Sequence, residues 1–441
     1  MSHNPFSLIA AARGRSATAD ALELKARIHR KLLETIDLPR AQRMSLEQLH
    51  RECSQRVDEL LSLEHRPLSA PEKAQLVYEV LDEIFGLGPL ESLLRDPGVS
   101  DILVNGAHQV YVERDGRLEL TSINFRDHDH LLTVIHRIAA FVGRRVDESS
   151  PMLDARLADG SRVNAIIPPL SLDGPTLSIR RFGKNPIDIA RLLELQALTE
   201  EIGALLRACV AGKVNILISG GTGTGKTTLL NVLSQWIPAG ERVVTIEDAA
   251  ELKLQREHVV RLETRPPNIE GKGEVMQRDL LRNSLRMRPD RIVIGEVRGA
   301  EALDMLQAMN TGHEGSMTTV HANNPWDALR RVENMVSMAG LNYPIRVIRD
   351  QISSALNIVV QVCRLTGGRR KLVSIVEVEG MDGDQIAMQE LFRFRQDGLD
   401  ADGHAHGHFE ACGVVPKLLD RLQAEGHQLA ASLFERRTLG K

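Results

Sequence analysis

The most chemically informative residues of this chain form a run of glycine, threonine and lysine at positions 220–227, with the spacing GxxxxGK(S/T). Glycines let the backbone turn so that its N–H groups point at phosphate oxygens, and the lysine after them reaches the outer phosphates. We therefore expect Lys226 to contact the β- and γ-phosphates of a nucleotide and the Thr227 hydroxyl to bind Mg²⁺. The expected nucleotide-binding residues are Gly220, Gly221, Thr222, Gly223, Thr224, Gly225, Lys226, Thr227 and Thr228.

Two apolar segments further along the chain end in carboxylates. Residues 243–248 end in Glu247 and Asp248, and residues 290–298 contain Glu296. In an open α/β sheet, ligands bind beyond the carboxyl ends of the strands, so these side chains should face the same nucleotide. Mg²⁺ needs hard oxygen ligands, often through its own waters, and an attacking water needs a carboxylate to orient it. We expect Glu247 and Asp248 in the first role and Glu296 in the second.

Three more polar side chains each have a purely structural alternative. His321 follows a short predicted strand and could hydrogen-bond the γ-phosphate, but a histidine satisfied within a turn is the interpretation that the sequence alone favours. Arg180 and Arg181 end another predicted strand. Because side chains alternate between the faces of a strand, at least one of these arginines should face solvent, with no function required.

The segments around the glycine run predict the elements that position it. Residues 214–219 are rich in β-branched residues, as in a buried parallel strand, and a helix is predicted from Thr227. From Pro186 onward, predicted strands alternate with helices. This pattern predicts an α/β fold in which a mostly parallel sheet is covered by helices on both faces, within a domain of residues 185–441.

The preceding part of the chain divides into three predicted regions. Residues 1–18 lack periodicity and are predicted to be a disordered tail. Residues 19–86 form a predicted helical bundle, for which a partner-docking module is the functional alternative. Residues 87–184 form a predicted α+β domain that ends in a hinge at 183–186. The predicted helices are 19–36, 46–63, 71–85 and 128–142, and the predicted strands are 101–105, 110–113, 117–120, 162–168 and 176–182.

Composition restricts the function classes. The 441 residues suffice for two or three domains, the net charge is −4, and aromatic residues make up 3%, so nucleic-acid binding is not expected. The four cysteines form no CxxC pair, which predicts reduced thiols without zinc or disulfides. No apolar run approaches the roughly 18 residues of a membrane span, and the N-terminus lacks a signal-peptide pattern. We therefore expect a cytoplasmic protein that reaches a membrane only through partners.

A histidine-containing segment near the C-terminus has a structural interpretation. His404, His406 and His408 alternate after an Asp-Ala-Asp-Gly run that lacks the first and last ligands of a calcium loop. We interpret the segment as a solvated hairpin rather than a metal site.

The glycine run, the two segments that end in carboxylates and the segment that ends at His321 resemble, in order and spacing, the secretion-superfamily ATPases. These are the hexameric motors of type II and type IV secretion and of type IV pili. Within this superfamily the chain is most similar to the CpaF/TadA branch, which powers tight-adherence (Flp) pili. Residues 146–152, 162–169 and 261–268 carry the resemblance to that branch.

The resemblance implies a RecA-like P-loop domain that uses ATP and Mg²⁺, a homohexamer, and inner-membrane pilus platform proteins as partners, with no direct nucleic acid. It implies that Glu296 is the catalytic carboxylate, that Glu247 lies near the metal and water, and that His321 senses the γ-phosphate. Arg180 and Arg181 match arginines that the N-terminal domain of the family presents to nucleotide phosphates, a task suited to the fixed fork of arginine. Arg265 and Arg298 are weaker candidates for nucleotide contact.

Three other functions stay open at this stage. The first is a type IV secretion motor for substrate or DNA transfer. The second is a RecA-like DNA helicase or recombinase, which would require a basic, aromatic-lined channel that the sequence does not suggest. The third is a regulatory nucleotide-binding module, against which the two acidic segments argue.

Overall fold

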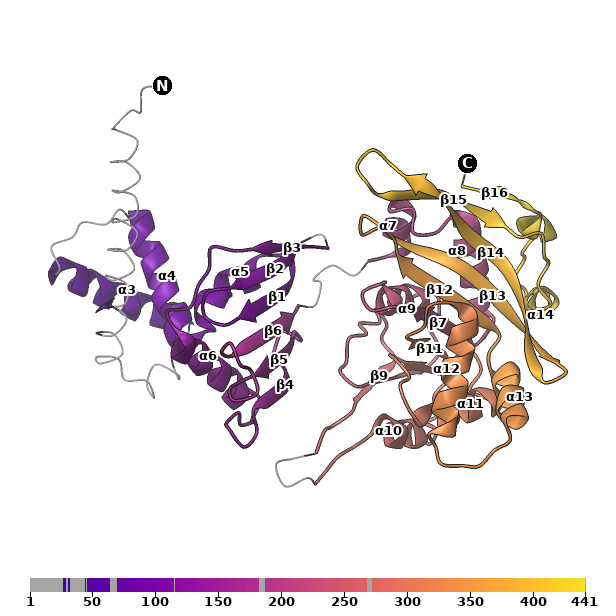
Figure 1. Cartoon of the computed structure of the whole chain (residues 1–441), viewed down its shortest axis with the longest axis horizontal. Helices are drawn as coiled ribbons and strands as arrows, with labels where there is room; N and C mark the ends of the chain where they lie inside the picture. Colours follow the sequence, from indigo (N-terminus) through magenta and orange to yellow (C-terminus); the bar gives the residue numbers. More distant parts are fainter. Residues whose placement is uncertain are drawn as a thin grey trace. The chain divides into compact units, whose positions relative to one another are not determined.

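The computed structural model describes residues 27, 28, 31, 44, 46–63, 70–114, 116–181, 187–267 and 272–440. The chain divides into two compact units, residues 1–184 and 185–441 (Figure 1). The predicted tail, most of the predicted helix at 19–36 and the predicted hinge at 183–186 lie outside the described residues.

The first unit begins with two packed helices, α3 (Leu46–Leu63) and α4 (Ala70–Phe85), where helices were predicted. The end of α4 is fixed to α6 (His128–Phe141) because His130 Nε2 lies 2.8 Å from Glu83 Oε2 and Arg137 donates to the Glu83 carbonyl at 2.9 Å. The buried residues shared by the helices are Ile28, Leu49, Cys53, Val57, Leu61, Leu76, Val77 and Val80.

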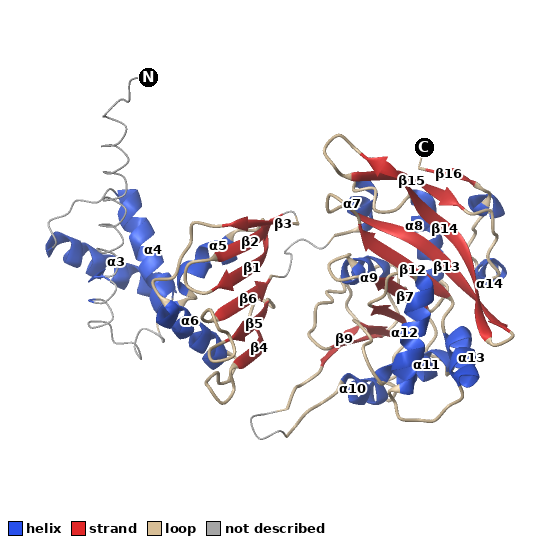
Figure 2. Cartoon of the chain, viewed as in Figure 1, coloured by secondary structure: helices blue, strands red, loops and turns tan. Residues whose placement is uncertain are grey.

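A six-stranded antiparallel sheet in the order β3-β2-β1-β6-β5-β4 forms the rest of the first unit, with α6 packed in the same core (Figure 2). The short helices η1 (Gly88–Leu90) and α5 (Glu91–Arg95) precede it. The sequence predicted five of the six strands and missed β4, because only Leu153 in it is fully buried and Met152 is 62% exposed. The strands are β1 (Val99–Asn105), β2 (Val110–Arg114), β3 (Arg117–Leu120), β4 (Met152–Arg156), β5 (Arg162–Ile166) and β6 (Thr176–Arg180).

The second unit is built on a ten-stranded sheet in the order β16-β15-β14-β13-β12-β7-β11-β10-β8-β9. Six neighbouring strands of this order are parallel to one another, namely β12, β7, β11, β10, β8 and β9. Strands β13 to β16 extend the sheet as antiparallel strands. The strands are β7 (Ile216–Gly220), β8 (Val243–Glu247), β9 (Val259–Glu263), β10 (Arg291–Ile294), β11 (Met317–Val320), β12 (Ile358–Arg364), β13 (Arg370–Asp382), β14 (Gln385–Leu399), β15 (Ala405–Ala411) and β16 (Arg437–Leu439).

Helices cover both faces of this sheet, as the sequence predicted. Ile216 and Ile218 of β7 belong to one apolar core and Leu217 to the other, because successive side chains of a strand point to opposite faces. The first core includes α7 (Ile189–Glu194), α8 (Glu200–Ala211), α9 (Lys226–Ser234), α14 (Leu418–Ala424) and η2 (Ala431–Phe434), and the second includes α10 (Gln277–Ser284), α11 (Glu301–Asn310), α12 (Pro325–Ser337) and α13 (Ile345–Ala355).

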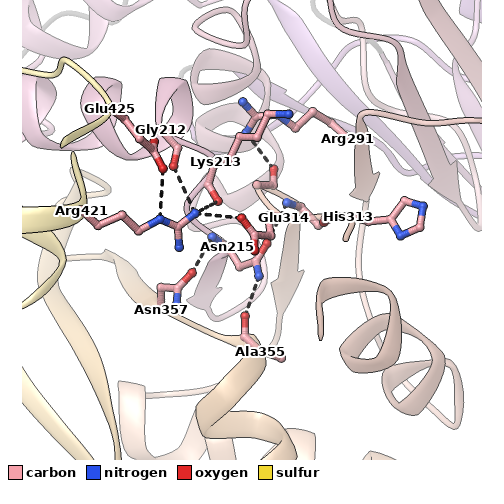
Figure 3. Close-up of polar contacts among 12 residues, drawn as sticks. Gly212, Lys213, Asn215, Arg291, His313, Glu314, Ala355, Asn357, Arg421 and Glu425 are labelled. Carbon is pink, nitrogen blue, oxygen red and sulfur yellow. Dashed lines mark hydrogen bonds and ion pairs between the residues drawn. The ribbon is translucent and has the colours of Figure 1, made fainter. Parts of the chain in front are cut away.

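A polar network joins the C-terminal helix to the amino ends of the parallel strands (Figure 3). Arg421 of α14 donates to Glu314 Oε2 at 3.1 Å and to the Lys213 carbonyl at 3.2 Å. Asn215, immediately before β7, donates to the Ala355 carbonyl at 2.7 Å. These contacts fix the ends of β7 and β11 that lie away from the glycine run.

The segment with three histidines lies in a hairpin, as the sequence predicted, because β14 and β15 pair antiparallel across a short turn. His406 and His408 lie in β15, which pairs with β14, so the segment is part of the sheet. His408 lies 2.8 Å from Asp397 and 3.2 Å from Glu410, and hydrogen bonds to these carboxylates raise its pKa. None of the described helices combines the length and apolar composition that a membrane span needs.

Candidate active site

The glycine run forms a loop between β7 and α9. Gly223 and Gly225 have φ angles of 70° and 97°, in the left-handed region where only glycine is unstrained, and Gly225 caps the helix. A Cβ atom on Gly220 would lie 2.5 Å from the Val362 carbonyl oxygen, so this glycine allows the loop to pass close to β12. The N–H groups at the start of α9 lie at the positive end of the helix dipole, as anion binding requires.

Lys226 lies within this loop as a buried cation, with 7% of the residue exposed. Its Nζ atom donates to the Gly221 carbonyl at 2.8 Å and lies 3.3 Å from His321 Nε2. Burial, more than any neighbouring charge, lowers the pKa of Lys226. The side chain of Thr224 donates to the same Gly221 carbonyl at 2.9 Å, which closes the loop on itself.

Glu296 links the histidine to an arginine. Its Oε1 atom lies 3.1 Å from His321 Nε2, and its Oε2 atom accepts from Arg298 at 2.9 Å. Arg298 also lies 3.6 Å from Asp248 Oδ2. A single proton on His321 Nε2 can be donated to Glu296, or the bare nitrogen can accept from Lys226, but not both at once. Desolvation, followed by the charge of Lys226, lowers the pKa of His321 and favours the neutral ring.

The sheet explains why these side chains meet. β10, β11 and β7 are parallel neighbours, with Ile294 opposite Thr318 and Val320 opposite Ser219. Glu296, His321 and the glycine loop all follow the carboxyl ends of these strands. In parallel sheets these ends lie at one edge, so residues distant in sequence share one site.

Glu247 is more buried than a metal ligand with free access to solvent would be. It is 3% exposed, and its Oε2 atom accepts from the backbone N–H groups of Glu251 at 2.6 Å and Leu252 at 2.9 Å. Its Oε1 atom is buried and has no hydrogen-bond partner among the residues that the structure describes. Burial raises the pKa of Glu247 to about 7. A Cβ on Gly295 would lie 2.8 Å from Glu247 Cγ, so that glycine makes room for the carboxylate.

These features fit a nucleotide with its magnesium ion. The loop supplies N–H groups and Lys226 for phosphate, and Thr227 follows Lys226 in the first turn of α9. The orphaned Oε1 of Glu247 needs a partner that a metal-bound water could supply, and Asp248 follows it at the end of β8.

The two arginines of the first unit have different surroundings. Arg180 is paired with Asp101 at 3.1 Å, and its side chain is 61% exposed. Arg181 donates through one nitrogen to the carbonyls of Leu93, Asp96 and Val99, at 3.4 Å for Leu93 and 2.9 Å for Val99. The sequence predicted that at least one arginine would face solvent. Arg180 does so, whereas Arg181 joins the end of α5 to the start of β1.

Sequence reasoning missed two contacts to the site. Gln277 of α10 donates to the Glu296 backbone carbonyl at 2.9 Å, and Arg370 of β13 donates to the Gly223 carbonyl at 2.9 Å. No local pattern marks Gln277, whereas Arg370 ends a Gly-Gly-Arg-Arg run typical of a tight turn. Of the two weaker candidates for nucleotide contact, Arg298 lies in this cluster through its bond to Glu296. Arg265 instead donates from Nε to the Gly273 carbonyl oxygen at 2.7 Å.

The fold and this cluster define a P-loop ATPase. The family model described as "Type II/IV secretion system protein" matches residues 83–404, and the chain belongs to this family of secretion ATPases. The "Putative conjugal transfer protein" of Mycobacterium tuberculosis is 38% identical over 335 residues, which is 71% of this chain and 95% of that protein.

Two solved structures can also be aligned with this chain. The VirB11 ATPase of the Brucella suis type IV secretion system, crystallised with sulphate, is 30% identical, covers 67% of this chain and 97% of its own, and superposes with a TM-score of 0.36. The pilus retraction motor PilT with bound ADP is 18% identical, covers 79% of this chain and 88% of its own, and has a TM-score of 0.49.

Proposed function

We propose that this chain is a homohexameric motor that binds ATP with Mg²⁺ at residues 220–228 and hydrolyses it with Glu296 as the catalytic carboxylate. The observation that carries the proposal is the contact chain from Lys226 Nζ through His321 Nε2 to Glu296 Oε1, with links of 3.3 and 3.1 Å. It joins a phosphate-binding cation, a neutral hydrogen-bonding ring and a carboxylate at one sheet edge.

Each side chain has a distinct task in hydrolysis. The oxygen of a water bonds to the γ-phosphorus while the bond from that phosphorus to the β–γ bridging oxygen breaks, giving ADP and phosphate. Glu296 accepts a hydrogen bond from the water and orients it, and Lys226 offsets charge on the phosphoryl oxygens. His321, held neutral by its lowered pKa, hydrogen-bonds the γ-phosphate.

Magnesium, when bound, neutralises charge on the β- and γ-phosphate oxygens. Thr227 would hold it directly, with Glu247 and Asp248 acting through water. The buried Oε1 of Glu247 supports this assignment because it has no hydrogen-bond partner within the described ranges of the chain.

The first unit is proposed to complete the site with Arg180 and Arg181. Arg180 is the better candidate because its guanidinium is exposed, while Arg181 already bonds backbone carbonyls of its own unit. The guanidinium of arginine is charged at every physiological pH, and the fixed arrangement of its N–H donors matches phosphate oxygens.

We propose that the motor is cytoplasmic and drives assembly of a type IV pilus of the Flp/Tad kind through inner-membrane platform proteins. The resemblance of residues 146–152, 162–169 and 261–268 to the CpaF/TadA branch supports this process. A second candidate is substrate or DNA transfer through a type IV secretion channel. The names of the mycobacterial and Brucella relatives favour it.

The test is a chromosomal Lys226→Ala substitution in the organism that encodes the chain, with surface filaments and conjugal transfer frequency measured together. Loss of filaments with unchanged transfer would support the pilus motor. Loss of transfer with normal filaments would contradict it in favour of the second candidate. If the variant protein accumulates normally and both processes continue, neither candidate is correct.

A further inference from the structure

The turn between β12 and β13 reaches the glycine loop. β12 runs parallel to β7 with Val362 opposite Gly220, and β13 begins at Arg370, which pairs with Arg364. The turn is closed by two backbone bonds, from Leu365 N–H to Arg369 at 2.7 Å and from Gly368 N–H to Leu365 at 3.0 Å. The turn therefore lies beyond the carboxyl end of β7, where the glycine loop starts.

Arg370 makes the contact between this turn and the loop. Its Nε atom donates to the Gly223 carbonyl oxygen at 2.9 Å. Its Cδ atom would lie 3.6 Å from a Cβ built on Gly225, so the stem of the side chain passes close to the loop as well. The contact joins residues far apart in sequence and comes from a strand that carries none of the nucleotide-binding motifs.

The contact has a consequence for phosphate binding because a peptide unit is planar and trans. The carbonyl of Gly223 and the N–H of Thr224 belong to one such unit and point in opposite directions. A donor that holds the Gly223 oxygen therefore fixes the direction of the Thr224 N–H. Gly223 and Gly225 both adopt left-handed conformations that glycine reaches without strain, so the residue types alone do not fix this peptide and an external contact can orient it.

We propose that Arg370 is a positioning residue that fixes the Gly223–Thr224 peptide, so that the Thr224 N–H points into the phosphate cradle. The inference rests on the proposed function, in which this loop binds ATP. Arg370 acts through the loop and need not touch the nucleotide. Its loss should therefore weaken nucleotide binding while leaving the rate at saturation near that of the wild type.

The adjacent Arg369 provides a matched control. It belongs to the same turn and carries the same charge, but its guanidinium pairs with Asp400 Oδ2 at 3.1 Å. Its substitution removes an equal charge at nearly the same place without touching Gly223. Comparing the two alanine variants separates the specific hydrogen bond from the local positive potential.

The experiment measures ATP hydrolysis and ADP affinity of the full chain for the wild type and for Arg370→Ala, Arg370→Lys, Arg369→Ala and Lys226→Ala. We expect Arg370→Ala to raise the KM for ATP and the Kd for ADP about tenfold, with kcat within about twofold. Arg370→Lys keeps the charge but lacks Nε, so it should behave like Arg370→Ala. Arg369→Ala should match the wild type, and thermal melting should change little in all three.

Two results would overturn the inference: equal weakening by Arg369→Ala and Arg370→Ala, or unchanged affinity in Arg370→Ala. A fall in kcat with a lowered melting temperature would indicate a structural role and would also overturn it. If Arg370→Ala does not fold, Arg370→Lys decides by the same criteria.

Lys226→Ala distinguishes a failure of the proposed nucleotide site from a failure of the proposed role of Arg370. If it binds ADP as tightly as the wild type, the proposed nucleotide site itself is wrong. If it loses binding while Arg370→Ala does not, only the role of Arg370 is wrong.

Discussion

His321 Nε2 lies 3.1 Å from Glu296 Oε1 across the ends of the neighbouring strands β11 and β10. The same nitrogen lies 3.3 Å from Lys226 Nζ. Because the ring is held neutral by its lowered pKa, it can change partner between the carboxylate and the cation by moving one proton between its nitrogens. The contact ties the proposed catalytic carboxylate to the glycine loop.

Alanine substitutions of Arg180 and Arg181 should have different effects, one mainly on activity and the other mainly on stability. Arg181→Ala leaves three backbone carbonyls without their guanidinium donor, so the free energy of unfolding of the first unit should fall by about 2 kcal/mol. Arg180→Ala removes an ion pair in which the arginine is 61% exposed and Asp101 is 20% exposed, and should change stability by less than about 1 kcal/mol, while kcat/KM falls at least about tenfold. Urea denaturation and steady-state ATP hydrolysis measure both effects. Unchanged kcat/KM in Arg180→Ala would remove this residue from the proposed site.

The raised pKa of Glu247 implies that the stability of the metal-free protein depends on pH. Its pKa is about 7 in the folded state against 4.5 as the ordinary value, so between these values the folded state binds more protons than the unfolded state. The free energy of unfolding therefore falls as pH rises through this window, by on the order of 3 kcal/mol from this group.

Glu247→Gln removes this titration and tests it directly. With EDTA present, the stability of the wild type relative to Glu247→Gln should be greater at pH 5 than at pH 8, as measured by urea denaturation. A difference between the two proteins that stays constant with pH would show that the carboxylate is ionised throughout. It would then be stabilised by the N–H groups of Glu251 and Leu252.

The N-terminal helices should be dispensable for hydrolysis but not for assembly. Deleting residues 1–68 removes α3, whose Val57 and Leu61 share a core with Val77 and Val80 of α4. The proposed nucleotide-binding residues all lie outside this region, so ATP hydrolysis per chain should stay within about twofold, whereas filament formation should be lost. Purified deletion protein and a deletion strain provide the two measurements. A folded deletion protein without hydrolysis would make these helices part of the working core.

Elements with strong local patterns could be predicted from the sequence. The glycine run, β7, β8 and α6 have residue types that decide their structure locally, and the shared edge of parallel strands follows from general topology. The strand β4 was missed because its alternation is weak. The contact of Arg370 with Gly223 depends on which strand lies beside β7, which periodicity cannot show.

The central claim is tested most directly by Glu296→Gln in a single-turnover experiment, with ATP affinity measured on the same protein. The amide keeps the shape but orients water poorly, so the rate of ATP cleavage should fall at least about 100-fold while the Kd for ATP stays within about threefold of the wild type. Glu314→Gln, the same change before the opposite end of β11, is the matched control and should cleave ATP at the wild-type rate. Cleavage at the wild-type rate by Glu296→Gln, with weakened ATP binding, would contradict the account and make Glu296 a binding group.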